Sequence, residues 1–137
     1  MLEALRARLG SIPSVTVQRN TAVPETVPAS GLIVLRDGDA GEPEQALGGF
    51  ADSYYSHRVE IEVYVSEGDV AARDAAFDAL LQEIGIVLEA DPTLGGLAFG
   101  MTYGRPDPTI EPASGALAFK TGVIELEIDY EAPSPLG

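Results

Sequence analysis

The sequence predicts one α+β domain, in which one long and one short helix pack on one face of a mainly antiparallel sheet. Two segments alternate apolar and polar residues with the period of two that is typical of half-buried strands. A long helical pattern lies between them. Strands and helices do not alternate regularly, as they would in a parallel, doubly wound sheet. The length, 137 residues, fits a single domain over residues 1–137.

The N-terminal part is expected to contain a short helix and brief strands. Three leucines have helical spacing: Leu2, Leu5 and Leu9. Gly10 is placed to end this helix. Short apolar runs predict strands at 15–17 and 32–35, separated by a connection that contains prolines. Glycine and acidic residues predict a loop over 37–49.

The predicted sheet has two long strands, at 56–65 and 121–130. The apolar faces of these strands are formed by His57, Val59, Ile61, Val63 and Val65 in the first, and by Ile124, Leu126, Ile128 and Tyr130 in the second. A further strand is expected at 97–103, followed by a proline-rich loop at 104–115. The tail at 132–137 is expected to be flexible.

The long helix is expected to begin near Asp69, a favourable N-cap residue, and to end before Pro92. Its apolar stripe consists of Val70, Phe77, Leu80, Leu81, Ile84, Val87 and Leu88. Paired glycines at 95 and 96 permit the positive φ angles of a turn after it.

Composition excludes several classes of function. The chain has no cysteine, which removes thiol nucleophiles and cysteine-based metal sites. The net charge is −14, and the eight basic residues are scattered, whereas a DNA-binding surface needs a basic patch. No apolar stretch approaches the length of a membrane helix, and the first residues do not form a secretory signal. We therefore expect a soluble intracellular product.

His57 is the only histidine and so the natural candidate for acid–base catalysis. Asp52, Ser53 and Ser56 are close to it in sequence. A strand, however, directs Ser56 and His57 to opposite faces, and a catalytic triad must converge. Ser114 does not lie in a Gly-x-Ser-x-Gly elbow and suits a turn. We expect no catalytic residue and a structural or interfacial His57.

The glycine- and acid-rich segments predict neither a metal site nor a cofactor site. Counted from Asp37, the EF-hand positions for a ligand, a glycine and a glutamate hold Gly41, Glu42 and Gly48. The glycine-rich stretch at 95–100 follows a helix and enters a strand, whereas phosphate-binding loops lead into a helix.

Acidic residues occupy the polar faces of both long strands: Glu60, Glu62, Glu125, Glu127 and Asp129. Such a face stays solvated, lines a channel or meets a basic partner. Tyrosines near Arg58 (Tyr54, Tyr55 and Tyr64) are candidate interface anchors, because Tyr and Arg are enriched at binding hot spots; packing in the core is an equally good interpretation.

The order of several segments carries a resemblance. In the first half they are Val15–Asn20, Leu32–Leu35, the acidic glycine-rich loop and His57–Val63. In the second half they are the helical Phe77, Leu80, Leu81 and Ile84, then Asp91-Pro92-Thr93-Leu94-Gly95-Gly96-Leu97-Ala98, and the final Ile124-x-Leu126-x-Ile128-x-Tyr130. Over nearly its whole length the chain resembles the tail terminator proteins of long-tailed bacteriophages, of the lambda minor tail protein U type.

This resemblance implies a structural virion protein that is not an enzyme and holds no cofactor. It implies a ring, commonly a hexamer, that caps the tail tube, stops its elongation and joins the tail to the head-completion or connector proteins. The implied partners are further copies of the chain, the major tail tube protein and the connector. DNA would pass through the ring without sequence-specific binding. The implied location is the head-proximal end of the virion tail, after synthesis in the bacterial cytoplasm.

A ring closed by head-to-tail contacts needs two different, complementary faces on each subunit. By residue type, the candidates for one such face are Arg19, Tyr54, Tyr55 and Arg58. Glu125 and Glu127 are candidates for a lumen face that repels DNA. The predicted loops are expected to order on meeting the tube or the connector.

Two alternatives stay open at this stage. One is a small α+β enzyme or ligand-binding domain, with a pocket between sheet and helix and His57 at its edge. The other is a head-completion or other neck protein of similar size.

Overall fold

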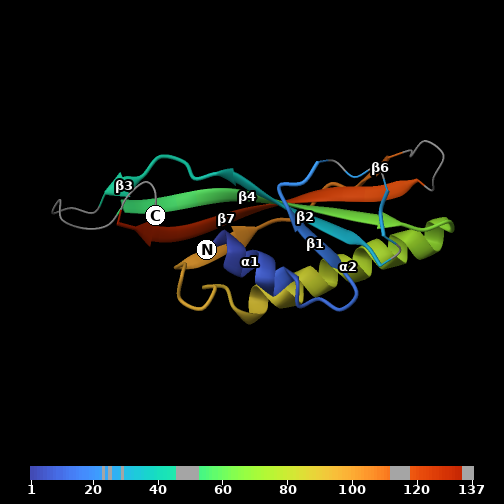
Figure 1. Cartoon of the computed structure of the whole chain (residues 1–137), viewed down its shortest axis with the longest axis horizontal. Helices are drawn as coiled ribbons and strands as arrows, with labels where there is room; N and C mark the ends of the chain where they lie inside the picture. Colours follow the sequence, from blue (N-terminus) through green and yellow to red (C-terminus); the bar gives the residue numbers. More distant parts are fainter. Residues whose placement is uncertain (23, 25, 29, 46–52, 112–117, 134–137) are drawn as a thin grey trace.

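The computed structural model describes residues 1–137 apart from 23, 25, 29, 46–52, 112–117 and 134–137. Figure 1 shows the described elements, which follow one another in the order α1 (Leu2–Leu9), β1 (Thr16–Arg19), β2 (Leu32–Asp39), β3 (Glu44–Gln45), β4 (Ser53–Ser66), α2 (Val70–Ala90), β5 (Gly100–Tyr103), β6 (Thr109–Glu111) and β7 (Phe119–Ala132). No helix among them is long and apolar enough to cross a membrane.

The strands form one sheet in the order β1-β2-β4-β7-β5, with β3 added to β4 and β6 added to β7. Only β1 and β2 are parallel among the described pairs. The central pair, β4 and β7, keeps one register over 14 residues of each strand, and in Figure 1 these strands run along most of the molecule. The predicted mainly antiparallel α+β fold is confirmed.

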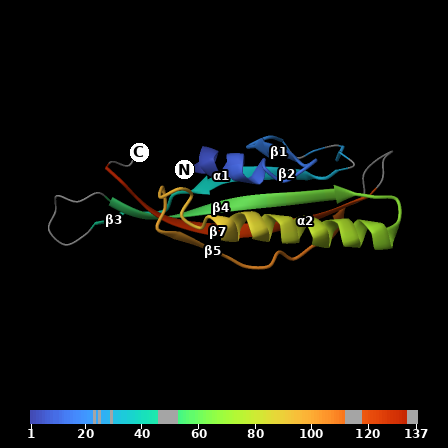
Figure 2. The same cartoon turned by 90° about the horizontal axis from the view of Figure 1, so that it is seen from below.

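Both helices pack on one face of this sheet (Figure 2). α1 buries Leu5 and Leu9. α2 is capped by Asp69, whose side chain accepts a hydrogen bond from the backbone N of Ala72, and it buries Phe77, Leu80, Ile84 and Leu88. The predicted apolar face of β4 is buried as expected: His57, Val59, Ile61, Val63 and Val65. Val70 was assigned to the helix stripe wrongly: it is 61% exposed, because it begins the helix directly after the turn from β4.

The other face, which we call the outer face, is not the uniformly solvated acidic surface that alternation predicts. One part of it holds a second apolar cluster: Leu32, Val34, Tyr64 and Phe119, with Val27 packed against them. Arg36 bonds Glu62 at 2.6 Å and donates to the backbone carbonyl of Thr21, so the connection after β1 is held over this cluster. Burial and the bond to Glu62 raise the pKa of Tyr64 to about 12.

Several predicted boundaries are wrong because pairing with the long strands extends or creates short ones. β2 continues to Asp39 and β3 forms inside the predicted loop 37–49. β6 forms inside the predicted loop 104–115, and β5 begins only at Gly100. β7 reaches Ala132, which is buried. Predictions that concern Asp52, Ser114 or the tail at 134–137 fall outside the described residues.

Candidate functional site

His57 lies on the helix-facing side of β4. It is 8% exposed, and Nε2 donates to the carbonyl oxygen of Asp37, while Nδ1 is buried without a partner among the described residues. Ser56 is exposed on the outer face, where its hydroxyl donates to Asp129 at 2.6 Å. Ser53 lies four positions from His57 along β4, which corresponds to about 13 Å at the usual rise per residue. Neither serine converges on the imidazole.

Arg19 is held on the helix-facing side by contacts within the chain. Its Nε and Nη2 donate to the two carboxylate oxygens of Asp37 at 2.6 and 2.8 Å, and Nη1 lies 3.7 Å from Glu3 of α1. The guanidinium holds the pKa of the Asp37 carboxyl below its usual range, first through this hydrogen bond. Arg19 therefore does not share a surface with the other candidates for the partner interface.

The outer face brings together Arg58 and the two predicted lumen residues. Arg58 of β4 stands opposite Glu127 of β7, with Nε 3.7 Å from the carboxylate, and its side chain is 82% exposed. Glu60, the next outward residue of β4, stands opposite Glu125. Glu62 was predicted to belong to this acidic surface, but only 12% of its side chain is exposed and Arg36 neutralises it.

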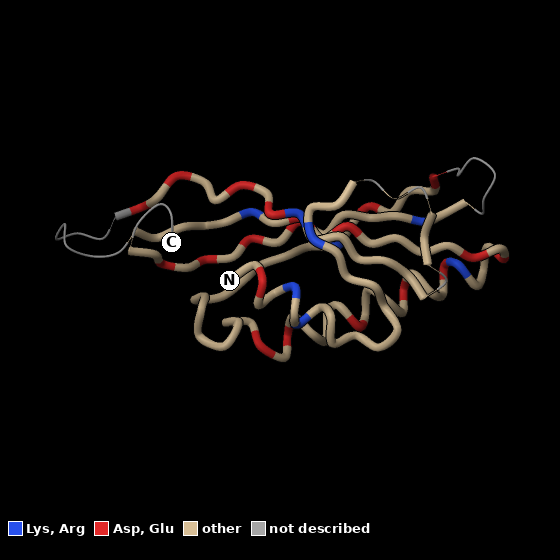
Figure 3. Tube along the Cα trace, viewed as in Figure 1, with Lys and Arg blue, Asp and Glu red and all other residues tan. Residues whose placement is uncertain are grey.

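We call the hollow over this part of the outer face the acidic groove. It consists of two adjoining cavities of about 490 and 650 Å³ that share Asp39, Arg58 and Glu127. Figure 3 shows acidic positions along the segment before β3 and along the long strands beside it. The carboxylates that line the groove are Asp39, Glu42, Glu44, Glu60, Glu125, Glu127 and Asp129. Of the described basic residues, Arg58 alone lines it.

Aromatic side chains form one end of the acidic groove. The rings of Tyr54 and Phe99 lie 5.7 Å apart, and Phe99 is 59% exposed. The rings of Tyr55 and Tyr130, stacked at 5.4 Å, alternate along β4 and β7 with the outward residues Ser56 and Asp129, so they lie on the helix-facing side of the sheet. Tyr55 is only 5% exposed, and its buried hydroxyl has no hydrogen-bond partner among the described residues. Tyr55 is therefore a buried side chain and not an exposed anchor.

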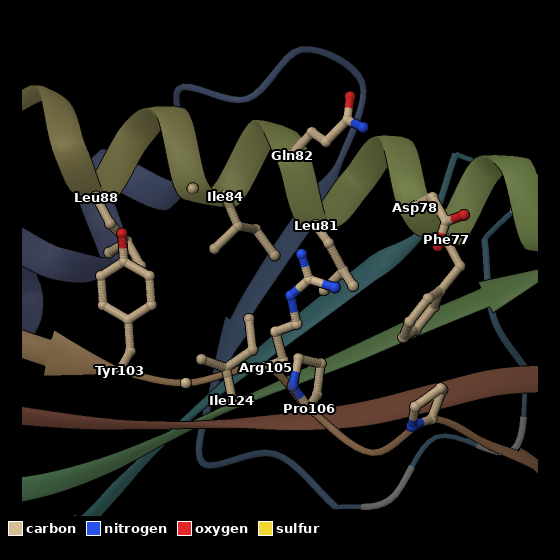
Figure 4. Close-up of a pocket in the computed structure, with 13 residues that line it drawn as sticks. Phe77, Asp78, Leu81, Gln82, Ile84, Leu88, Tyr103, Arg105, Pro106 and Ile124 are labelled. Carbon is tan, nitrogen blue, oxygen red and sulfur yellow. The ribbon is translucent and has the colours of Figure 1, made fainter.

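A second hollow, of about 660 Å³, lies between α2 and the chain that follows β5 (Figure 4). Its wall is largely apolar and includes Phe77, Leu81, Ile84, Leu88 and Ile124, with Pro106 on the facing segment. This is the pocket between sheet and helix that an enzyme or ligand-binding domain would use, but His57 does not line it.

The described part of the chain offers no cluster of side chains for binding a metal ion. No group of three or more His, Asp or Glu side chains there is arranged to hold a metal ion. The carboxylates of the acidic groove are instead spread along it.

Sequence reasoning found the two strand rows of the acidic groove but missed its walls. The segment 39–44 was assigned to a loop, and Phe99 to the interior of a strand. Neither position has a periodicity that predicts a groove, because the wall depends on where β3 and β5 pair with the long strands.

Comparisons with known proteins give only distant likenesses. No protein-family model matches the chain, and a search of curated proteins gives no match. The chain is similar to a structure of the virion of a native gene transfer agent particle: 16% identity, a TM-score of 0.39, and coverage of 91% of this chain and 84% of that one. It is also similar to a structure of the sheath/tube terminator of PVC, an extracellular contractile injection system, in the extended state. There the identity is 9%, the TM-score is 0.41, and the coverage is 96% of this chain and 55% of that one. TM-scores this low assign neither a family nor a role.

Proposed function

We propose that this chain is a structural virion protein, a tail terminator that assembles into a ring on the end of a tail tube. The ring stops elongation of the tube and joins the tail to a head-completion or connector protein. A hexamer is the expected ring, and its place is the head-proximal end of the tail. The chain is not an enzyme in this proposal.

The observation that carries the proposal is the placement of the segments with the sequence resemblance. Val15–Asn20 contains β1, Leu32–Leu35 begins β2, and His57–Val63 lies in β4. The apolar helix residues lie in α2, and the final alternating segment, Ile124 to Tyr130, lies in β7. The strands among these segments all belong to a single sheet, and α2 packs against it.

The sheet also supplies what head-to-tail ring closure requires. Its strand order ends in β1 on one side and β5 on the other, so the two edges differ in sequence. Unpaired strand edges are ready surfaces for another chain. Two unlike surfaces on each subunit permit heterologous contacts, which close into a ring when the rotation per subunit allows it.

The acidic groove has two uses in such a ring. Facing the lumen, Glu125 and Glu127 would repel DNA during its passage. Facing a neighbouring protein, they would receive basic side chains. A groove with aromatic walls suits the second use better than the first, since repulsion alone requires no cavity.

Mass measurement and imaging test the proposed role. We expect the purified chain to form a small ring, with six times the 14.3 kDa chain mass for a hexamer, or a monomer that caps added tail tubes. Light scattering gives the mass, and negative-stain imaging gives the tube lengths with and without the chain. Tubes that stop growing in its presence would support the proposal. A strict monomer or dimer that leaves tube growth unchanged would overturn it.

A further inference from the structure

We propose that the acidic groove binds an arginine-containing basic segment of a partner protein. Seven carboxylates line its two cavities, against the single guanidinium of Arg58. That excess of negative charge lies on one concave surface, so its potential adds along the groove. Charge complementarity therefore defines the occupant as a cationic chain.

Two carboxylates in the groove repel each other, and a cationic occupant would remove this repulsion. Glu60 and Glu125 stand directly opposite each other on β4 and β7. Like charges in this position destabilise a sheet. Arg36, the residue opposite Glu60 on β2, is bonded to Glu62 and does not neutralise them. A guanidinium between the two carboxylates would convert this repulsion into attraction.

The aromatic end favours arginine over lysine. Tyr54 and the exposed Phe99 form a tilted pair at the rim of the first cavity. A planar guanidinium stacks on such rings and donates to carboxylates at the same time.

Other occupants fit the groove less well. A single metal ion needs converging ligands, and the described carboxylates provide no such group. Nucleic acid would be repelled. A second copy of this chain offers no basic segment, because its eight basic residues are scattered and six of them already form ion pairs within the chain: Arg6, Arg8, Arg19, Arg36, Arg58 and Lys120. The occupant is therefore a different protein.

Fluorescence anisotropy with a labelled octa-arginine peptide, at about 50 mM NaCl, tests the proposal on the full chain. The variant Glu125→Gln with Glu127→Gln should weaken binding about tenfold, since two charge-assisted contacts are lost. The matched control is Glu83→Gln with Asp107→Asn, which changes the net charge equally at two exposed residues outside the groove. It should change affinity less than about twofold.

Two further variants give the test a direction that general charge attraction does not predict. Arg58→Gln should strengthen octa-arginine binding about threefold, because it removes the cation that competes for Glu127. Phe99→Ala should weaken binding of octa-arginine but not of octa-lysine. Circular dichroism and thermal unfolding verify that each variant is folded.

Several outcomes would overturn the proposal. They are the absence of binding by the unaltered chain, an equal loss in the two double variants, and weaker binding by Arg58→Gln. The peptide assay does not depend on ring formation. A chain that binds the peptide but leaves tail tubes uncapped would refute the proposed function and retain this inference, and the reverse result would do the opposite.

Discussion

Asp37 joins three strands through separate atoms of one residue. Its carboxylate accepts two hydrogen bonds from Arg19 of β1, and its carbonyl oxygen accepts one from His57 of β4. Its backbone N donates to the side-chain oxygen of Asn20 at 3.0 Å. A residue that the sequence places in an acidic loop is thus a connection between β1, β2 and β4.

The Asp37–Arg19 pair predicts a pH dependence of stability. The folded pKa of Asp37 is below its unfolded value, so its stabilisation is complete above the unfolded pKa and is lost as pH falls through the folded pKa. Asp37→Asn should therefore cost about 1 kcal/mol or less near neutral pH, since both side chains are about one-third exposed, and progressively less below about pH 4. Urea unfolding between about pH 7 and 2.5 measures this difference.

A double-mutant cycle with Arg19→Gln separates the pair from other effects of the substitution. In the Arg19→Gln background, Asp37→Asn should have a smaller effect that depends less on pH. A cost that increases as the pH falls would contradict the assignment of the lowered pKa to this ion pair.

Gly38 permits the bulge that follows Asp37. From Arg36 to Asp39, β2 has one residue more than the facing part of β4, and Gly38 takes a φ of +66°. A Cβ atom at this position would lie 1.9 Å from the carbonyl oxygen of Arg58. The backbone of β2 or β4 must move to accept any side chain here.

We predict that Gly38→Ala destabilises the fold by about 2 kcal/mol or more, through backbone strain and steric overlap. The control is Gly100→Ala, since a Cβ atom there would have no neighbour within 4 Å and φ is not positive. It should change stability by about 0.5 kcal/mol or less. Urea unfolding of both variants gives the comparison, and equal losses would contradict the steric account.

At the scale of the element, α2 owes its stability to one buried stripe. Phe77, Leu80, Ile84 and Leu88 recur at helical spacing, and each is at most 6% exposed. Ile86, on the same helix, is 64% exposed. The chain therefore contains two isoleucines of the same secondary structure in opposite environments.

We predict that Ile84→Ala costs about 2 to 5 kcal/mol, because it removes buried methyl groups and leaves a cavity. Ile86→Ala should change stability by about 0.5 kcal/mol or less, since alanine favours the helix and little apolar area is lost. Chemical denaturation with equal m-values would allow a direct comparison. Similar costs at both positions would show that α2 packs differently from the arrangement in Figure 2.

At the scale of the whole molecule, net charge opposes the compact state. The formal charge is −14, and in the described residues carboxylates gather on the outer face. Each surface ion pair of the six basic residues contributes little to stability. Screening by salt therefore removes less stabilisation from these pairs than it removes destabilisation from the general repulsion. Added salt should therefore stabilise the chain.

We predict a melting temperature that rises by a few degrees between about 20 and 300 mM NaCl, because the shorter Debye length screens the repulsion between surface carboxylates. Differential scanning fluorimetry measures it. The variant Glu125→Gln with Glu127→Gln should show a smaller rise, because it removes the repulsion between Glu60 and Glu125. A melting temperature that falls with salt would mean that the ion pairs dominate.

The sequence by itself determined the elements that bury an apolar face. β4 and β7 alternate apolar and polar residues, and α2 repeats apolar residues at helical spacing. Burial removes these apolar faces from water, so His57, Phe77 and Ile124 lie on the faces that the two periods predict. The fold class follows from the order of these elements. The placement of Ser56 and His57 on opposite faces also follows from the alternation within one strand.

Only the tertiary structure decided the short strands, the second apolar cluster and the acidic groove. β3 and β6 are held by main-chain pairing with β4 and β7, which every residue type except proline can provide. The cluster around Tyr64 exists because a connection crosses the outer face. Arg19 and Arg58, equivalent by residue type, lie on opposite sides of the sheet, because strand register and not composition determines which charges meet.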